Sequence, residues 1–435
     1  MKKHIYIPLL LLGLTLSVQA QQVVPIAKSD VLSKVSERNT SIKISEEDFK
    51  QARADYRQTN AVFLPNITAS HTAMATTNPL MAFGSKLNQE ILTQNDFNPA
   101  LLNDPSQIEN YATKFEIQQP LINLDGIYQR KAAKSKMEAM SLKTERTQDY
   151  LAFEVDKAYM QLQLAYKAVS VLEKALDAAN ANKKLADDSF KQGYLQRADV
   201  LNVEVRVTEV QNQLQTAKSN VQNASNYLSF LMNDEAYVVY MPSDDLTIGT
   251  FTMEDKAVSE NRSDIKAMQL ASNAYEAMNK ADKMAFLPRL NAFGSYELYD
   301  DKIFQGGSNG YLFGAQLSWD IFQGSKRIGK AQKSKSEFEK SKLEYKQYVS
   351  QSNLELNKAK RAFIDADNKL KLTTLALQQS EESLRIRTNR FKEGLEKTSD
   401  LLLAETQYAQ KQLEYYQTIF EYNYTQAYLQ FLTKE

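Results

Sequence analysis

The sequence predicts a mainly α-helical protein made of two tandem copies of a long helical hairpin, with a small β part of four strands. The tetrapeptide Phe-Lys-Gln-Gly at 190–193 recurs at 391–394 as Phe-Lys-Glu-Gly. Helix breakers are also distributed alike, because residues 127–232 hold no proline and only Gly193, and residues 330–435 hold no proline and only Gly394. An internal repeat with one break per copy indicates a duplicated hairpin.

A heptad pattern runs along the first helix of each hairpin. Large apolar residues recur every seven positions, with one lapse at Lys183: Val155, Leu162, Val169, Leu176 and Phe190 in the first copy, and Val349, Leu356, Phe363, Leu370, Leu377, Leu384 and Phe391 in the second. Small residues such as Ala158 and Ala359 follow three positions later, which favours close helix packing and left-handed supercoiling. A simple antiparallel coiled-coil rod would show the same pattern, so the helices alone leave that alternative open.

The N-terminus is typical of a secretory signal peptide. A lysine-containing start is followed by an apolar run over 5–18 and by Val18-Gln19-Ala20, so we expect cleavage after Ala20 and an exported chain. The chain has no cysteine, which excludes disulfides, a lipoprotein anchor and a cysteine-based metal site. No later segment contains eighteen consecutive apolar residues, so we expect no membrane-spanning helix.

Four short segments have the alternation of β-strands: 67–77, 111–121, 290–299 and 311–321. In the second segment Tyr111 and Phe115 share one face, whereas Lys114 and Glu116 share the other. Strands of about ten residues with one apolar face and aromatic ends are typical of outer-membrane barrels. For any single segment, a half-buried sheet in a soluble protein is the better explanation of the pattern.

The order of the strands favours the membrane. They form two pairs, and each pair follows a Phe-Leu-Pro sequence, at 63–65 and 286–288, and precedes a long helix. Four strands are too few to close a barrel, and open sheet edges in lipid would leave backbone groups without partners. Three chains would supply twelve strands, which lies within the observed range of barrel sizes. We therefore expect a homotrimer with a twelve-stranded β-barrel.

These signals predict the domain organisation. It consists of a signal peptide (1–20), a first repeat (21–235) with helices over 126–190 and 199–232, a linker (236–252), and a second repeat (253–435) with helices over 325–391 and 399–433. The connection within the first strand pair, residues 78–110, is unusually long, and loops of this length are commonly functional or mobile. In a barrel of this topology the connection would be extracellular. Whether it narrows the pore stays open.

In these features the chain resembles the TolC-like outer-membrane efflux proteins from about Lys28 to Leu432. The resemblance is carried by the Phe-Leu-Pro strand entries, the Gln-Pro-Leu-Ile-Asn turn at 119–123, the Phe-Lys-x-Gly tips and the duplication. It implies a trimeric duct in the outer membrane of a Gram-negative bacterium, whose β-barrel continues as an α-helical barrel in the periplasm. It also implies a periplasmic adaptor (membrane fusion) protein and an inner-membrane transporter as partners, in multidrug, metal or metabolite efflux or in type I secretion of proteins. The sequence does not identify the cargo.

The residues at the two tips are the candidate functional residues. The expected adaptor-docking tip consists of Gly193, Tyr194, Leu195, Gly394 and Leu395, and the gate candidates are Asp400, Leu403, Glu396, Asp199 and Arg197. In the resembled family, acidic residues at the second tip narrow the periplasmic mouth, and Asp400 matches the main acidic position. Leu403 stands where a further acid is expected and Glu396 where a basic residue is expected, so the gate would be partly hydrophobic or rewired. Alternatively, Asp199 and Asp400 serve only as helix caps.

The sequence shows no catalytic constellation. His71 is the one histidine beyond the signal peptide and is interpreted as structural, and there is no glycine-rich phosphate loop, paired histidine or nucleophile motif. The formal net charge of +0 does not indicate a nucleic-acid partner. We therefore expect no enzyme, no cofactor and no bound metal. The main alternative to the duct is a periplasmic or secreted coiled-coil scaffold without a pore.

Overall fold

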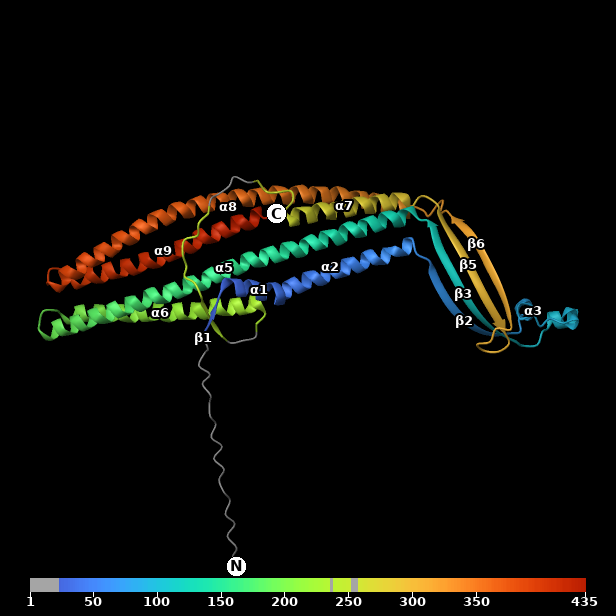
Figure 1. Ribbon diagram of the computed structural model, residues 1–435, viewed down its shortest axis with the longest axis horizontal. Coiled ribbons are helices and arrows are strands. Elements are labelled where there is room, and N and C mark those ends of the chain that lie inside the picture. The colour runs from blue at the N-terminus through green and yellow to red at the C-terminus, as the bar shows by residue number, and fades with distance from the viewer. Residues whose placement is uncertain (1–22, 235–237, 252–256) are drawn as a thin grey trace, which may run out of the picture. The chain divides into compact units, whose positions relative to one another are not determined.

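The computed structural model describes residues 23–234, 238–251 and 257–435 of the chain, so the predicted signal peptide lies outside the described residues. The elements follow one another (Figure 1) as β1 (Val23–Ile26), α1 (Lys28–Arg38), α2 (Thr40–Gln58), β2 (Asn66–Thr76), α3 (Pro79–Asn88), α4 (Pro99–Asn103), β3 (Ile108–Ile122), α5 (Leu124–Lys191), α6 (Arg197–Met232), β4 (Val239–Pro242), α7 (Ser263–Met284), β5 (Arg289–Asp300), β6 (Ser308–Ser318), α8 (Lys326–Lys392) and α9 (Thr398–Thr433). The prediction of a mainly helical chain with tandem hairpins is confirmed.

The chain forms two compact units, and each unit contains parts of both repeats. One unit comprises the residues up to 43 together with 147–258 and 353–434, and the other comprises 44–146 and 259–352. The first unit holds both helical hairpins with their tips. The second unit holds the four-stranded sheet and the helical segments that lead into it. The sequence repeat and the packing of the chain therefore divide the molecule in different ways.

The two long helices bury the heptad pattern. Helix α5 has 68 residues and α8 has 67, so each is about 100 Å long at 1.5 Å per residue. Val155 and Leu162 on α5 have no exposed surface, and Leu356 on α8 is 2% exposed. The small residues are buried too, with Ala158 at 1%. Burial of alternating large and small side chains lets each long helix pack along the returning helix of its own hairpin.

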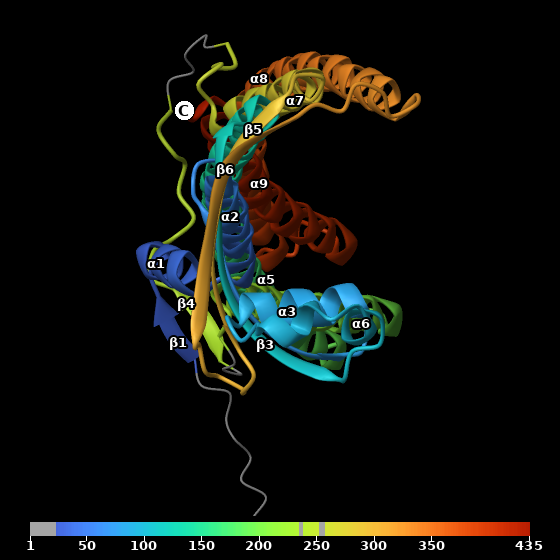
Figure 2. The same cartoon turned by 90° about the vertical axis from the view of Figure 1, so that its right-hand side faces the viewer.

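A two-stranded sheet lies where a plain linker was expected. Strand β4 falls within the expected linker 236–252, and its residues Val239 to Pro242 pair in parallel with β1. Figure 2 shows the two strands side by side near α1. The hydroxyl of Tyr159 on α5 donates a hydrogen bond to the carbonyl oxygen of Ile26 at 3.1 Å. Ile26 and Tyr240 are buried in a cluster with α5 and α6, so this small sheet closes the apolar core at the base of the first hairpin.

The four longer strands form one antiparallel sheet in the order β2-β3-β5-β6. Their register aligns the apolar residues in rows on one face: Ala69, Phe115, Tyr296 and Tyr311 in one row, and Ile67, Ile117, Gly294 and Phe313 in the next. The intervening rows on the other face are largely polar: Ser70, Lys114, Glu297 and Gly310, and Thr68, Glu116, Ser295 and Leu312. Within the described residues β2 and β6 each pair with a single strand, so both edges of the sheet are free.

The end of β6 differs from the sequence prediction. Strand β6 ends at Ser318 instead of 321, and the indole N–H of Trp319 donates to the carbonyl oxygen of Phe286 at 2.9 Å, which turns the chain out of the sheet. His71 on β2 has the structural role expected of it, because its Nδ1 lies 2.9 Å from the hydroxyl of Thr113 and its ring stacks on Phe304 at 4.4 Å.

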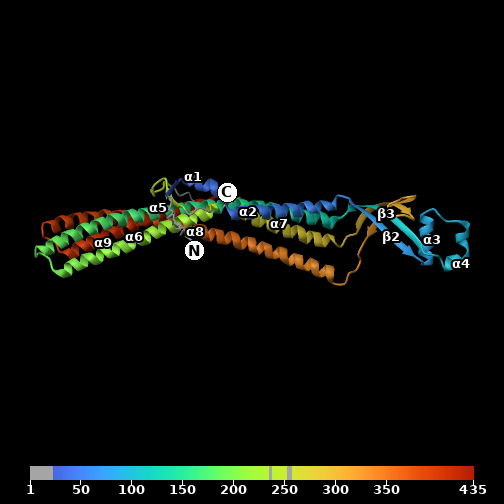
Figure 3. The ribbon, with the colours of Figure 1, turned by 90° about the horizontal axis from the view of Figure 1, so that it is seen from below.

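The long connection over 78–110 is folded rather than open loop. It forms α3 and α4 beyond the ends of β2 and β3 (Figure 3). Asn78 and Asn98 cap these helices, since their side chains accept hydrogen bonds from the N–H groups of Met81 at 3.3 Å and Ala100 at 3.0 Å. An Asn-Pro pair at each start is a cap followed by proline at the first helical position, which is the local signal for these helices. Gln89 ties the segment to the sheet by donating to the carbonyl oxygen of Glu109 at 2.8 Å.

Candidate functional site at the helix tips

The repeated glycines end the long helices in the same way. Gly193 has φ +81° and Gly394 has φ +72°, which is left-handed backbone that L side chains rarely adopt. The N–H of Gly193 donates to the carbonyl oxygen of Phe190 at 2.9 Å, and the N–H of Tyr194 donates to that of Ser189 at 2.9 Å. In the second copy, the N–H of Gly394 donates to the carbonyl oxygen of Phe391 at 3.0 Å, and the N–H of Leu395 donates to that of Arg390 at 2.9 Å. This is the Schellman type of C-cap, so the backbone strongly favours glycine at this position.

The residues that follow each glycine project into solvent. Tyr194 is 79% exposed and Leu395 is 67% exposed, and the two hold equivalent positions in the two copies. Leu195 is half-buried. A Cβ added to either glycine would meet no atom within 4 Å. The tips therefore present two exposed apolar side chains with open space around them, and no tip side chain shields them.

The two tip aspartates differ in their bonding. Both occupy the third position of their helices. The Asp199 carboxylate accepts a hydrogen bond from the backbone N–H of Gln196 at 3.2 Å, which completes a capping box at the start of α6. In the described part of the chain the Asp400 carboxylate makes no hydrogen bond or ion pair, and the start of α9 has no side-chain cap. Capping thus accounts for Asp199 and does not account for Asp400.

The acidic residue at the unexpected tip position is neutralised within its own hairpin. The two carboxylate oxygens of Glu396 accept hydrogen bonds from Arg387 Nη1 and Arg390 Nε, both at 2.8 Å. Hydrogen bonding by Arg390, together with the charge of Arg387, holds the pKa of Glu396 below its usual value. The basic charge absent from position 396 is thus supplied by the end of α8. In the first hairpin, Arg197 forms a 3.8 Å ion pair with Glu204, and both are side chains of α6.

Leu403 lies one helical turn after Asp400 and is 54% exposed. An exposed leucine beside an unpaired carboxylate gives the start of α9 a mixed apolar and acidic surface. This arrangement agrees with the expectation of a partly hydrophobic gate, although the gate role of these residues stays a prediction.

A partly buried polar cluster that the sequence did not single out joins the two hairpins. This interhairpin cluster consists of Asn182 on α5, Arg206 on α6 and Glu405 on α9. The Asn182 amide donates to the Glu405 carboxylate, and Arg206 is 7% exposed. Burial raises the pKa of Glu405 to about 6, although the charge of Arg206 and the bond from Asn182 oppose the shift. The local signal was weak, because Arg206 and Glu405 each stand next to an apolar heptad position.

A cavity of about 150 Å³ adjoins this cluster. Arg206 and Glu405 line it together with residues of both hairpins, among them Ala178 of α5 and Leu384 of α8. Arg206 and Glu405 therefore lie beside a space that the side chains do not fill completely.

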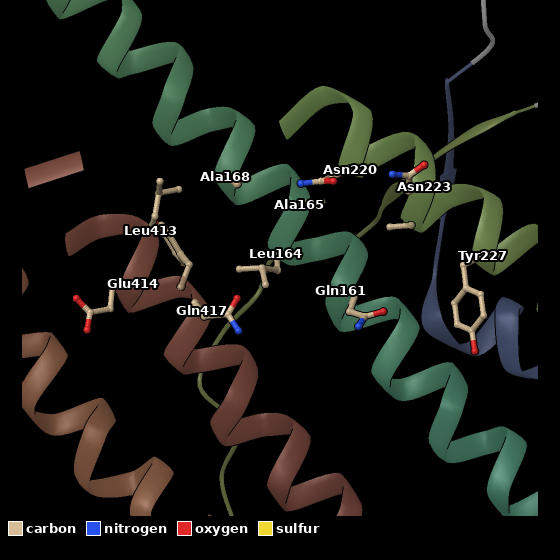
Figure 4. Close-up of a pocket in the computed structure, with 12 residues that line it drawn as sticks. Gln161, Leu164, Ala165, Ala168, Asn220, Asn223, Tyr227, Leu413, Glu414 and Gln417 are labelled. Atoms are coloured by element: carbon tan, nitrogen blue, oxygen red, sulfur yellow. The ribbon is translucent and has the colours of Figure 1, made fainter. Parts of the chain in front are cut away.

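A larger hollow of about 650 Å³ lies among α5, α6 and α9. Figure 4 shows the amide and apolar side chains around it: Gln161 and Leu164 on α5, Asn220 and Asn223 on α6, and Leu413 and Gln417 on α9. Two of its titratable groups have partners, since the hydroxyl of Tyr227 donates to the Glu154 carboxylate at 3.0 Å and Glu414 pairs with Lys411 at 2.8 Å.

The described residues contain no group of three or more histidine, cysteine, aspartate or glutamate side chains placed to hold a metal ion. Among the helices of those same residues, none is both long enough and apolar enough to cross a membrane.

Comparison with known proteins assigns the family. The pattern of the outer membrane efflux protein family matches residues 31–234 and 256–433, which are nearly all of the chain outside the predicted signal peptide and linker. The chain belongs to the outer membrane efflux protein family. No protein of curated function matches it in sequence.

Solved structures share the fold. A membrane protein from Pseudomonas aeruginosa superposes with a TM-score of 0.81 at 18% identity, over 93% of each chain. The outer-membrane channel OprN gives 0.81 at 17% identity, over 93% of this chain and 89% of its own. The CmeC outer membrane channel of Campylobacter jejuni gives 0.79 at 16% identity, over 93% of this chain and 85% of its own. This chain therefore shares the fold of these three solved proteins.

Proposed function

We propose that the protein is the trimeric outer-membrane exit duct of a tripartite efflux or type I secretion system in a Gram-negative bacterium. Substrates would pass from an inner-membrane transporter and a periplasmic adaptor through the duct to the outside. The observation that carries the proposal is the four-stranded sheet, which has one apolar face, one polar face and two free edges. Membership of the outer membrane efflux protein family supports the same function.

The sheet has the properties of a barrel segment. Its apolar face is not covered by the chain itself, since Phe115 is 47% exposed and Phe313 is 78% exposed. Large aromatic side chains in rows along a sheet suit contact with lipid, and the polar face suits a water-filled lumen. In lipid the free edges of β2 and β6 must find partners, because unpaired backbone groups cost several kcal/mol each. Pairing of β6 with β2 of the next chain closes twelve strands from three chains.

The tips carry the rest of the proposal. Gly193, Tyr194, Leu195, Gly394 and Leu395 form a repeated, exposed, apolar-tipped surface that suits docking by an adaptor. In a trimer, three copies of Asp400 and Leu403 would approach the axis at the narrow end of the α-helical barrel and form the gate. The adaptor and the transporter follow from the family resemblance and not from any contact in this chain.

Fractionation of cells tests the duct against the scaffold alternative. The full chain is expressed in a Gram-negative host, and the periplasm, inner membrane and outer membrane are separated with a marker enzyme for each. We expect the protein in the outer membrane, as an assembly that runs at lower mobility in detergent gels before boiling than after. Recovery as a soluble periplasmic protein would contradict the duct and favour the coiled-coil scaffold.

A further inference from the structure

The polar face of the sheet carries one compact group of charges. Lys114 on β3 lies between two glutamates, with its Nζ 3.1 Å from a carboxylate oxygen of Glu116 and 3.5 Å from one of Glu297 on β5. Lys114 and Glu297 are direct partners in the strand register. Their side chains are 39% and 27% exposed. We call Lys114, Glu116 and Glu297 the lumen triad.

Neighbouring side chains hold the triad in place. The Gln118 amide donates to Glu116 at 2.9 Å, the Ser295 hydroxyl donates to Glu297 at 3.4 Å, and the Tyr299 hydroxyl also donates to Glu297. All of these residues share the polar face by strand alternation. These bonds hold the Glu116 and Glu297 carboxylates at one level of the sheet.

The triad supplies the net charge of this face. Apart from it, the only charged residue that the described strands place on the polar face is Arg289, and its guanidinium is bonded to Asp125 at 3.1 Å at the helix-joined end of the sheet. With one lysine and two glutamates, each chain carries one net negative charge at the level of the triad. Glu297 lies three residues before the end of β5, about 10 Å from the end of the sheet remote from the long helices.

We propose that three lumen triads form a charged ring inside the barrel, near its extracellular exit, which makes the passage of cationic solutes easier than that of anionic ones. This inference rests on the proposed duct. In a twelve-stranded barrel the triads would lie within about 10 Å of the axis. Rings of charged side chains select ions in pores of this kind, and low-dielectric walls concentrate their field. Lys114, Glu116 and Glu297 are therefore specificity-determining residues for the solute that leaves the duct.

Two substitutions break the same Lys114–Glu297 ion pair but change the net charge in opposite directions. They therefore distinguish an effect of charge from an effect of the lost contact. Glu297→Gln brings the net charge of the triad to zero per chain, whereas Lys114→Gln brings it to two negative charges. Purified trimers are inserted in planar bilayers, and the reversal potential is measured in a potassium chloride gradient near 0.1 M. A change of three charges at this radius is expected to lower the cation-to-anion permeability ratio about two- to fivefold in Glu297→Gln and to raise it by a similar factor in Lys114→Gln.

The double variant Lys114→Gln/Glu297→Gln restores one net negative charge, and its permeability ratio is expected to return close to that of the wild type. The proposed ring is wrong if the channels conduct but the cation-to-anion permeability ratio is unchanged in both single variants. It is also wrong if both single variants shift this ratio in the same direction. If the wild-type trimer forms no channels at all, the duct itself is wrong, and the ring is overturned with it. The two failures are therefore distinguishable in one set of recordings.

Discussion

Asp400 is a carboxylate without a partner among the described residues, at the start of a helix whose cap it does not form. In a trimer three such charges would face one another near the axis, where they repel one another and attract cations. We expect Asp400→Asn to weaken cation selectivity and block by multivalent cations added on the periplasmic side of a planar bilayer. Stability should change by less than about 0.5 kcal/mol, because no bond is lost at a surface position.

Asp199→Asn is the matched control for this gate prediction, since the Asp199 carboxylate is already bonded to the N–H of Gln196. We expect a smaller change of selectivity in this variant. If Asp400→Asn leaves conductance and selectivity unchanged, the constriction lies elsewhere, and Leu403 is then the next residue to replace.

Glu405 makes the link between the hairpins sensitive to pH. Burial raises its pKa from 4.5 to about 6 in the folded protein. The folded state then binds this proton more tightly than the unfolded chain does, so the stability that Glu405 contributes is full below pH 4.5 and is lost as the pH rises through about 6. We expect Glu405→Gln to stabilise the protein at pH 7.5 by about 1 to 2 kcal/mol, because one pKa unit corresponds to about 1.4 kcal/mol.

The melting temperature of Glu405→Gln and of the wild type in detergent, followed by circular dichroism between pH 4.5 and 7.5, checks this prediction. The difference should shrink towards the acidic end. A constant difference across the pH range would show that Glu405 does not titrate there. Glu414→Gln serves as the control, because Glu414 lies on the same helix in a half-exposed ion pair with Lys411.

Gly394 needs its left-handed backbone and not the space around it. A β-branched residue is strained at φ +72°, and left-handed backbone costs about 1 to 2 kcal/mol for an L residue. We expect Gly394→Val to distort the tip and abolish export while outer-membrane trimers still form. Gly394→Asn should retain most export, because asparagine adopts this conformation readily. Normal drug resistance or secretion by the Val variant would contradict docking through this tip.

At the scale of elements, α7 is held by a buried ion cluster. Arg262 donates hydrogen bonds from two nitrogens to the Asp264 carboxylate at 2.7 and 3.0 Å. The Tyr348 hydroxyl on α8 donates to the same carboxylate at 2.6 Å. The Arg262 side chain is 3% exposed. Asp264→Ala takes away the carboxylate that faces the buried Arg262 guanidinium, so we expect it to lower the free energy of unfolding by about 3 to 5 kcal/mol.

Thermal unfolding in detergent measures this loss. Glu276→Ala on the same helix is the control, because Glu276 belongs to a half-exposed ion pair with Lys280 and should cost less than about 1 kcal/mol. Equal effects of the two substitutions would mean that the Asp264 cluster does not anchor α7.

At the scale of the whole molecule, the free edges of β2 and β6 determine the assembly. We expect the detergent-solubilised protein to have a mass of about 142 kDa, three times that of the chain without its first 20 residues. Light scattering with correction for bound detergent measures this mass. A stable monomer that keeps its full β content would refute the trimer, since its sheet would remain open in an apolar environment.

The sequence alone predicted the elements that have a local period. The heptad pattern placed both long helices to within two residues of their ends, and alternation placed Tyr111 and Phe115 opposite Lys114 in β3. The repeated tetrapeptide located both tips, because a helix that must reverse needs a left-handed residue there. Asn-Pro pairs at 78–79 and 98–99 are the local signal for α3 and α4, whereas the length of this connection indicates a loop.

Only the tertiary structure decided which distant residues meet. The pairing of β1 with β4, the Asn182–Glu405 bond between hairpins and the buried Asp264 cluster join residues far apart in sequence, and none of them has a periodic signature. The alignment of Lys114 with Glu297 likewise depends on the register between strands that belong to different repeats. The sequence determined the helices, the strands and their faces because these follow from short-range spacing, whereas charge pairs and pKa values follow from burial, which exists only once the chain has folded.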